Sequence, residues 1–299
     1  MPRFVALSGA SGLLGSALRP ALTTAGWQVR PLVRRAAHPG EVRWDPAAGT
    51  LDTAALAGVS AAVHLAGESV AEGRWTGAKK ARIRNSRILG THLLSESLAR
   101  LPQRPDVLVS ASAIGIYGDR GDELLNEDSP LGSDFLAEVG KEWEAATAPA
   151  ADAGIRVVHL RFGIVLARDG GALPRMVRPF LLGAGGPIGS GRQWMSWIAL
   201  DDAVRVVLDV LQNPEARGPF NAVAPEPVRN TDFAACLGDV LHRPALIPVP
   251  AFALRLLFGE MADAALLSSQ RVLPARLGAL GFEFRHPTLA GALRAVLDR

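Results

Sequence analysis

A glycine-rich turn near the start of the chain constrains its fold most strongly: residues 5–18 read "VALSGASGLLGSAL". An apolar run precedes the glycines Gly9, Gly12 and Gly15, and apolar residues at helical spacing follow them. Such glycines let the backbone approach a pyrophosphate, whose charge meets the free N–H groups at a helix start. The turn therefore predicts a strand and a helix that bind a dinucleotide, the alternative being an ordinary strand-to-helix connection.

Apolar stretches typical of strands alternate with stretches of helical periodicity. The strand candidates are 3–8, 27–33, 60–66, 106–111 and 155–160, and the helical candidates are 13–25, 76–100 and 134–153. Parallel strands need crossover connections of this length. The pattern predicts an α/β fold with a doubly wound parallel sheet of six or seven strands.

The pattern changes after Phe162, where a glycine-rich loop precedes a helix that we expect Asp201 or Asp202 to cap. The chain beyond Pro225 has mainly helical character. The predicted units are a dinucleotide-binding domain over 1–165, to which 195–224 returns, and a smaller, mainly helical substrate lobe over 166–194 and 225–299.

Composition narrows the class of protein. The chain has 299 residues of which 48% are hydrophobic, enough for a large core. No apolar run approaches the roughly 20 residues of a membrane helix, and the N-terminus leads straight into the glycine turn. The single cysteine, Cys236, has no partner for a disulfide or a metal site. We expect a cytoplasmic protein without a bound metal or a membrane partner, whose oligomeric state the sequence leaves open.

Basic residues exceed acidic ones only slightly. The net charge is +3, and the basic residues are scattered among 29 acids. One cluster, "KKARIRNSR" at 79–87, contains no aromatic residue on which a base could stack. A solvated helix face explains it better than a nucleic-acid surface, so we expect no nucleic-acid partner.

Two arginines follow the second predicted strand, where an acid would hydrogen-bond the 2′-hydroxyl of NAD. Arg34 and Arg35 can instead grip a 2′-phosphate through charge-assisted hydrogen bonds. The pair predicts NADP as the cofactor, with Arg34 better placed and at least one of the two facing solvent.

Further motifs resemble those of extended short-chain dehydrogenase/reductase proteins, in order and spacing over nearly the whole chain. They are "AVHLAG" (62–67), "SASAIGIYGD" (110–119), "RFGIVL" (161–166) and "WIALDDA" (197–203). The segments "HLAGESVAEGRWT", "SRILGT" and "DFLAEVGKEWEAA" are similar to the NAD-dependent epimerase/dehydratase branch, which ends in a small domain of unknown function. The resemblance implies a Rossmann fold.

This resemblance also assigns residues to the cofactor. Those implied near the pyrophosphate are Gly9, Gly12, Leu13 and Leu14, with Gly15 completing the motif. Those implied under the adenosine ribose are Leu65, Ala66 and Gly67, and those implied on the nicotinamide side are Arg161, Phe162, Gly163 and Ile164. His64 matches a family histidine, which we expect to be a buried core residue rather than a catalyst.

The catalytic residues are harder to place. Ser110 and Ser112 share one face at the end of an apolar strand, and Ser112 matches the family's carbonyl-binding serine more closely. The alternative is a serine that bonds local backbone. Ordinary members pair a tyrosine with a lysine four residues later, but Gly121 stands there after the single tyrosine, Tyr117. Glu68 is the candidate substitute for moving a proton, or else a loop charge.

Two functions remain open. The first is an NADP-dependent oxidoreductase or epimerase-like enzyme acting on an unidentified small molecule held between sheet and lobe. The second is an NADP(H)-binding regulatory protein with weak or no chemistry, for example one related to cell division. The missing tyrosine and lysine favour the second, and the serine and the full-length lobe favour the first.

Overall fold

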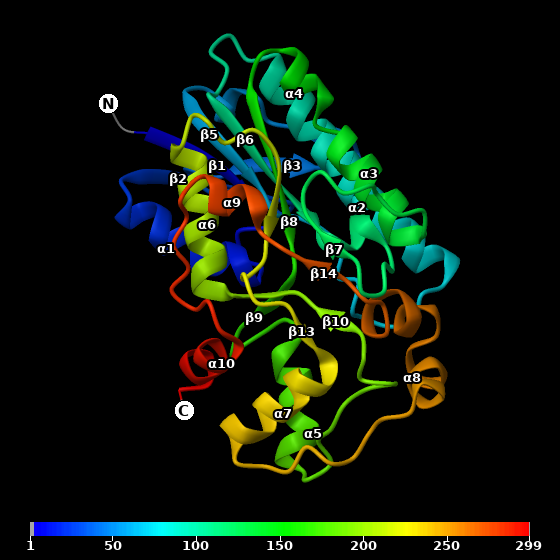
Figure 1. Ribbon diagram of the computed structural model, residues 1–299. Helices are drawn as coiled ribbons and strands as arrows, with labels where there is room; N and C mark the ends of the chain where they lie inside the picture. The colour runs from blue at the N-terminus through cyan, green and yellow to red at the C-terminus, as the bar shows by residue number, and fades with distance from the viewer. Residues whose placement is uncertain (1–2, 299) are drawn as a thin grey trace.

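The computed structural model describes residues 3–298 and is built around an eight-stranded sheet (Figure 1). The strand order is β12-β8-β6-β5-β1-β2-β3-β4. The strands are β1 (Arg3–Ser8), β2 (Trp27–Val33), β3 (Val42–Asp45), β4 (Thr50–Leu51), β5 (Val59–His64), β6 (Val107–Ala113), β8 (Arg156–Phe162) and β12 (Gly218–Ala222). Neighbours pair in parallel except β3 and β4. The parallel α/β sheet is confirmed, with the short β3 and β4 as additions that the sequence did not reveal.

Helices cover both faces of the sheet, as a doubly wound fold requires. One face packs against α1 (Leu13–Thr24) and α6 (Leu200–Gln212), and the other against α2 (Gly77–Ala99), α3 (Phe135–Ala145) and α4 (Ala148–Asp152). Buried side chains one turn apart, such as Leu18 and Leu22 on α1, fill the first interface. The chain turns from β1 to β2 on one side and continues through β5 and β6 on the other. The strand order therefore reverses next to β1, where sheets of this kind bind ligands.

Side-chain caps define some helix starts but not the one expected at α6. Thr76 accepts from the N–H of Lys79, and Asp134 accepts from that of Ala137. Asp201 and Asp202 lie inside the first turn of α6, and the N-cap is Ala199 without a side-chain bond, so the predicted cap is wrong. The buried Asp202 carboxylate instead accepts the N–H groups of Arg285 and His286, because tertiary packing brings that distant loop to it.

A smaller lobe lies below the sheet in Figure 1 and has its own apolar core. Its elements are α5 (Leu173–Leu181), α7 (Asn230–Leu241), α8 (Ala251–Phe258), the π-helical turn η3 (Ala262–Leu266) and α10 (Leu289–Leu297). Short strand pairs join it to the sheet: β9 (Ile164–Leu166) with β11 (Trp197–Ala199), β10 (Trp194–Met195) with β13 (Val228–Arg229), and β7 (Leu124–Leu125) with β14 (Arg271–Val272).

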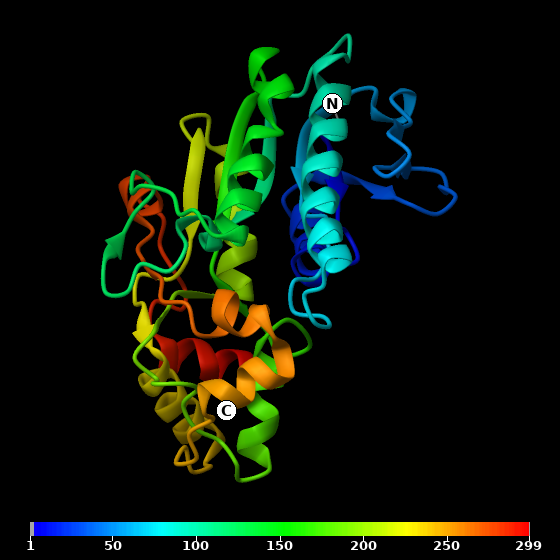
Figure 2. The ribbon, with the colours of Figure 1, turned by 90° about the vertical axis from the view of Figure 1, so that its right-hand side faces the viewer.

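Part of the segment 225–299, which we assigned to the lobe, returns to the sheet. Leu277 on α9 (Ala275–Ala279) is fully buried in the core between the sheet, α1 and α6, and Phe282 and Phe284 pack against the same core. Figure 2 shows the lobe beneath the ends of α2 and α3. Within residues 3–298, no helix combines the length and hydropathy needed to cross a membrane.

Candidate functional site

The glycine turn joins β1 to α1 at the edge where the parallel strands end. Gly9 has a φ of +68°, and a Cβ atom there would lie 2.8 Å from the carbonyl carbon of Leu65. A Cβ atom on Gly15 would lie 2.1 Å from the carbonyl oxygen of Gly9. Packing of the turn therefore requires glycine at both positions. A Cβ atom on Gly12 would meet that oxygen at 3.3 Å, so this position has more room.

The start of α1 presents backbone N–H groups that no side chain caps. Gly12 is the N-cap residue, and the first turn carries no acidic side chain. The N–H groups of Leu13, Leu14 and Gly15 have no partner within the helix, because no helical carbonyl precedes them by one turn. The helix dipole adds positive potential at the same place. The arrangement fits an anion such as a pyrophosphate. The side chain of Leu13 itself packs against the 170–171 glycines.

Two buried polar side chains, Ser8 and His64, hold the loop that follows β5. The N–H groups of Leu65 and Ala66 donate to Ser8 Oγ over 3.1 and 3.3 Å, and Ser8 Oγ lies 2.6 Å from His64 Nδ1. A hydroxyl has one proton and two acceptor positions, so Ser8 donates its proton to Nδ1 and the His64 proton sits on Nε2. Burial lowers the pKa of His64 to about 4, which keeps it neutral at neutral pH. His64 thus supports the loop from within the core.

Arg34 and Arg35 follow β2 and differ in their partners. The Arg35 guanidinium donates two 2.6 Å hydrogen bonds to Glu41. Together with the N–H of His38, these bonds lower the pKa of Glu41 to about 2. In the described part of the chain, no carboxylate lies within 4 Å of the Arg34 guanidinium. Arg34 therefore keeps its charge available to a ligand, whereas Arg35 neutralises the nearby acid.

These segments line one cleft of about 1010 Å³. Its lining includes Gly9, Ala10, Ser11, Gly12, Arg34, Arg35, Leu65, Ala66, Gly67 and Glu68. The cleft runs from the end of β2 across the glycine turn to the end of β5. Along the cleft lie, in this order, Arg34, the uncapped start of α1 and the loop at 65–67. This extended arrangement fits a dinucleotide better than a compact ligand.

Ser112 lies near the end of β6, where its side chain is buried against α3. The residue is 3% exposed, and its hydroxyl donates to Glu144 Oε1 over 2.7 Å. Ala113, on the opposite face of β6, is the exposed residue at the strand end. Strand alternation explains this placement, because neighbouring side chains point to opposite faces. Ser112 would have to break its bond to Glu144 before it could polarise a substrate carbonyl, and the geometry does not support that role.

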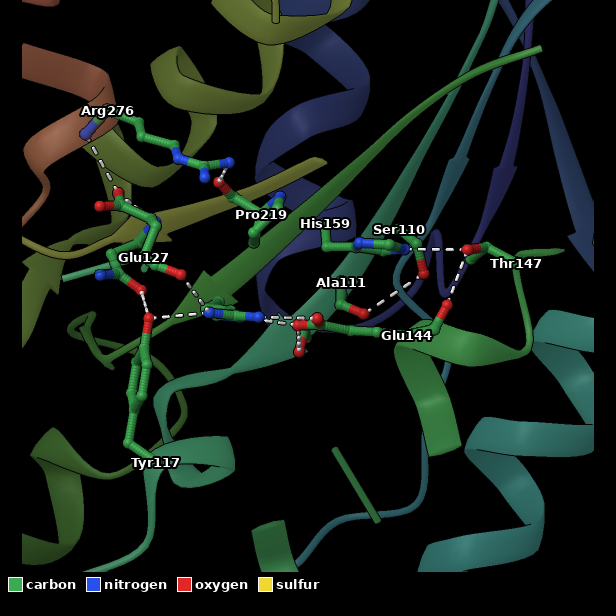
Figure 3. A network of polar contacts seen from close by, with 12 residues as sticks. Ser110, Ala111, Tyr117, Glu127, Glu144, Thr147, His159, Pro219 and Arg276 are labelled. Atoms are coloured by element: carbon green, nitrogen blue, oxygen red, sulfur yellow. Dashed lines mark hydrogen bonds and ion pairs between the residues drawn. The ribbon is translucent and has the colours of Figure 1, made fainter. Parts of the chain in front are cut away.

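Ser112 is bonded to a buried polar network that contains Glu144 and Tyr117 (Figure 3), and the sequence had not singled out Glu144 or Asn221. Arg161 donates to both carboxylate oxygens of Glu144 over 2.8 and 2.9 Å and to Tyr117 Oη over 2.9 Å. Tyr117 in turn donates to Asn221 Oδ1 over 2.7 Å and is fully buried. Burial opposes ionisation of Glu144, but Arg161 outweighs it and holds the pKa of that carboxyl below its usual range. The side chains of Arg161 and Tyr117 thus hydrogen-bond to other residues of the protein.

Glu68 lies at the cleft but is tied to α2. Lys79 Nζ donates to Glu68 Oε1 over 2.7 Å, and Arg82 Nε lies 3.7 Å from the same oxygen. The Lys79 hydrogen bond holds the pKa of Glu68 below its usual range. A carboxylate with a lowered pKa is a weak proton donor at neutral pH, so its role as a proton carrier stays a prediction.

The other sequence-predicted nicotinamide-side residues connect the sheet to the lobe. Phe162 packs against the main core, and the N–H of Ile164 donates to the Ser196 carbonyl over 2.9 Å. A Cβ atom on Gly163 would lie 2.5 Å from that carbonyl oxygen. Among residues 3–298, no three His, Cys, Asp or Glu side chains gather as a metal site would require.

Comparison with known proteins agrees with this architecture. The model of the NAD dependent epimerase/dehydratase family matches residues 5–223, and that of a domain of unknown function, DUF1731, matches residues 249–296. An epimerase family protein of Mycobacterium bovis is 43% identical over 290 residues, covering 97% of this chain and 96% of that protein.

Two solved structures extend the likeness. The crystal structure of human epimerase family protein SDR39U1 (isoform 2) with NADPH has a TM-score of 0.91 at 34% identity, covering 99% of each chain. A nucleoside-diphosphate sugar epimerase from Corynebacterium glutamicum has a TM-score of 0.83 at 40% identity, covering 99% of this chain and 58% of that one. Because the family model matches residues 5–223 and the relatives cover nearly the whole chain, this chain belongs to the NAD-dependent epimerase/dehydratase family.

Proposed function

We propose that the chain binds NADP(H) in the cleft and acts as an oxidoreductase or epimerase-like enzyme on a small molecule. The observation that carries this proposal is the cleft itself, with an uncapped helix start at Gly12 and with Arg34, which has no carboxylate partner within residues 3–298. The human relative crystallised with NADPH supports the same cofactor. NADP(H) bound there would supply hydride transfer at its nicotinamide ring.

Discrimination between NADP(H) and NAD(H) rests on the charges near β2. Glu41 would repel a 2′-phosphate, but Arg35 neutralises it through two hydrogen bonds. Arg34 and Arg19 are further cations among the residues that line the cleft. A guanidinium that donates to a phosphate forms charge-assisted bonds that NADH cannot form.

The substrate would lie beyond the nicotinamide, between the sheet edge and the lobe. Because the Corynebacterium glutamicum relative is named a nucleoside-diphosphate sugar epimerase, nucleotide sugars are the first class to test. The second candidate, an NADP(H)-binding regulatory protein with weak turnover, is favoured by one observation: Ser112 and Tyr117 are bonded within the protein.

Fluorescence titration with NADPH and NADH tests the cofactor proposal. We expect wild type to prefer NADPH, and Arg34→Ala to weaken NADPH binding tenfold to hundredfold, roughly one charge-assisted hydrogen bond. Arg217→Ala, an exposed arginine outside the cleft, is the matched control and should bind like wild type. Equal affinity of wild type for both cofactors would contradict the proposal. Incubation with NADP(H) and nucleotide sugars then separates an enzyme from a binding protein without turnover.

A further inference from the structure

The lobe carries most of the exposed apolar side chains of the described chain. Of the eleven large hydrophobic side chains that are exposed within residues 3–298, eight lie in two segments of the lobe, 181–182 and 246–258. These eight, which we call the apolar patch, are Leu181, Leu182, Leu246, Ile247, Phe252, Leu256, Leu257 and Phe258. A fully exposed side chain of this size presents on the order of 200 Å², so the patch exposes on the order of 1000 Å². The largest apolar patch on a monomeric protein is usually about 300–600 Å².

Backbone hydrogen bonds bring the two segments of the patch together. The N–H of Ile247 donates to the carbonyl oxygen of Gly185 over 3.0 Å, and the N–H of Val249 donates to that of Pro187 over 2.9 Å. The loop that follows Leu182 therefore runs beside the residues that lead into α8. The apolar patch is thus one connected strip of the lobe rather than a set of scattered side chains.

Helix α8 has the composition of a buried element. Its sequence, AFALRLLF, contains one charged residue, Arg255. A helix that is apolar on all sides is normally buried. Leu254 follows this rule, but Phe252, Leu256 and Leu257 are 71%, 73% and 63% exposed. Because α8 lies at the outer side of the lobe (Figures 1 and 2), its composition fits a contact with another molecule.

The charges beside α8 are paired within the chain. Arg255 Nη2 lies 2.9 Å from Asp263 Oδ1, and Lys80 Nζ on α2 lies 2.7 Å from Glu260 Oε1. Each pair is neutral as a whole. These charges therefore neither attract a strongly charged partner to the patch nor repel a second copy of the chain.

A second copy of the chain fits this strip better than a lipid surface does. Arg178 and Arg243 flank the two segments, whereas a surface that binds anionic lipid carries roughly four to eight clustered basic residues. A stable protein interface buries about 800 Å² on each partner, which the apolar patch can supply. In a two-fold dimer the same surface faces itself, and an apolar strip is complementary to its own copy.

We propose that the apolar patch is a dimer interface, in which α8 of one chain packs against the patch of a second copy. Phe252 and Leu256 lie one turn apart on the same face of α8 and form the centre of the contact, with Leu182 and Leu246 beside them. The lining of the cofactor cleft lies within residues 9–89, so the dimer leaves the cleft open. The proposal is therefore independent of the proposed function.

Sedimentation equilibrium of the full chain measures this contact. At about 100 µM, we expect wild type to sediment at twice the mass of one chain. Leu256→Glu and Phe252→Glu each place a carboxylate in the contact and should raise the dissociation constant at least about hundredfold. Leu131→Glu, at an exposed leucine outside the patch, is the matched control and should remain a dimer. Far-UV circular dichroism should be the same for all variants, because each substituted side chain is exposed.

Three results would overturn the inference. Wild type that sediments as a single chain at about 100 µM would show that the patch does not join two copies. A dimer that both Leu256→Glu and Phe252→Glu leave intact would place the contact elsewhere. Flotation with phosphatidylcholine vesicles, with and without phosphatidylglycerol, tests the competing occupant. We expect no flotation, and flotation of wild type that Leu256→Glu abolishes would assign the patch to a lipid surface.

Discussion

Along the edge where the parallel strands end, some polar groups near β1, β2 and β5 lack protein partners in the described chain, whereas those near β6 and β8 bond one another. Around β1, β2 and β5, the start of α1 is uncapped, and Arg34 has no carboxylate partner in the described chain. Around β6 and β8, by contrast, Ser112, Glu144 and Arg161 bond one another in a buried network. Polar groups left without protein partners are available to a ligand, whereas mutually bonded ones stabilise the fold. This difference is the reason why we propose the cofactor site in the first region, whereas the bonds of the second region stabilise the fold.

The largest expected effect is on the network. Glu144→Ala would leave the Arg161 guanidinium buried and without its carboxylate, and should lower the free energy of unfolding by about 3–5 kcal/mol. Urea denaturation at pH 7 measures this. Glu142→Ala is the matched control on the same helix, because Glu142 pairs with the exposed Arg84, and it should cost less than about 1 kcal/mol. Similar losses for the two variants would remove the contrast between the regions.

His64, which supports the loop after β5 through Ser8, should make the free energy of unfolding depend on pH. The folded state holds His64 neutral with a pKa near 4, while the unfolded chain takes up a proton near pH 6.5. The contribution of neutral His64 to the free energy of unfolding is therefore complete above about pH 6.5 and is lost as the pH falls toward 4. Between pH 7 and pH 4.5 it amounts to about 2–3 kcal/mol. Urea unfolding of wild type and His64→Asn over this range should give a shallower pH dependence for the variant; parallel curves would contradict it.

A pair of glycine substitutions sharpens the distinction within the turn. Gly15→Ala forces a Cβ atom against the Gly9 carbonyl oxygen and should cost roughly 1–3 kcal/mol of stability. Gly12→Ala would bring a Cβ atom to 3.3 Å from the same oxygen, a tight contact but a far milder one than in Gly15→Ala, so stability should change by under about 1 kcal/mol. NADPH affinity should fall, because Gly12 lines the cleft at the helix start where we propose that the pyrophosphate binds. Thermal melting and titration of both variants test this. Loss of stability without loss of affinity in Gly12→Ala would place the ligand elsewhere.

The smallest expected effect is that of Ser112→Ala. Arg161 still satisfies Glu144 in this variant, so stability should fall by about 1 kcal/mol, the net value of one hydrogen bond. NADPH affinity should not change, because Ser112 is buried away from the cleft. Unchanged stability combined with lost turnover of a true substrate would instead favour the carbonyl-binding role predicted from the sequence.

Much of the fold and the cofactor end could be read from residues close together in the chain. The glycine turn and the alternation of strands and helices predicted the doubly wound sheet, and Arg34 with Arg35 marked the end of β2. These features are local: a backbone that needs glycine, a helix start that follows it, and two adjacent side chains. The short strands β3 and β4 escaped prediction, because a four-residue and a two-residue strand carry too little periodicity.

The sequence by itself determined the sheet, the glycine turn and the absence of a tyrosine with a lysine four residues on. Only the tertiary structure decided which polar side chains are available. Ser112 and Glu144 are 32 residues apart, and Tyr117 and Asn221 are 104 apart, so no local pattern could pair them. The same packing committed Arg35 to Glu41 and left Arg34 free of a carboxylate in the described chain. Whether a polar group binds a ligand or stabilises the core depends on which groups folding places beside it, and that is a property of the packed chain.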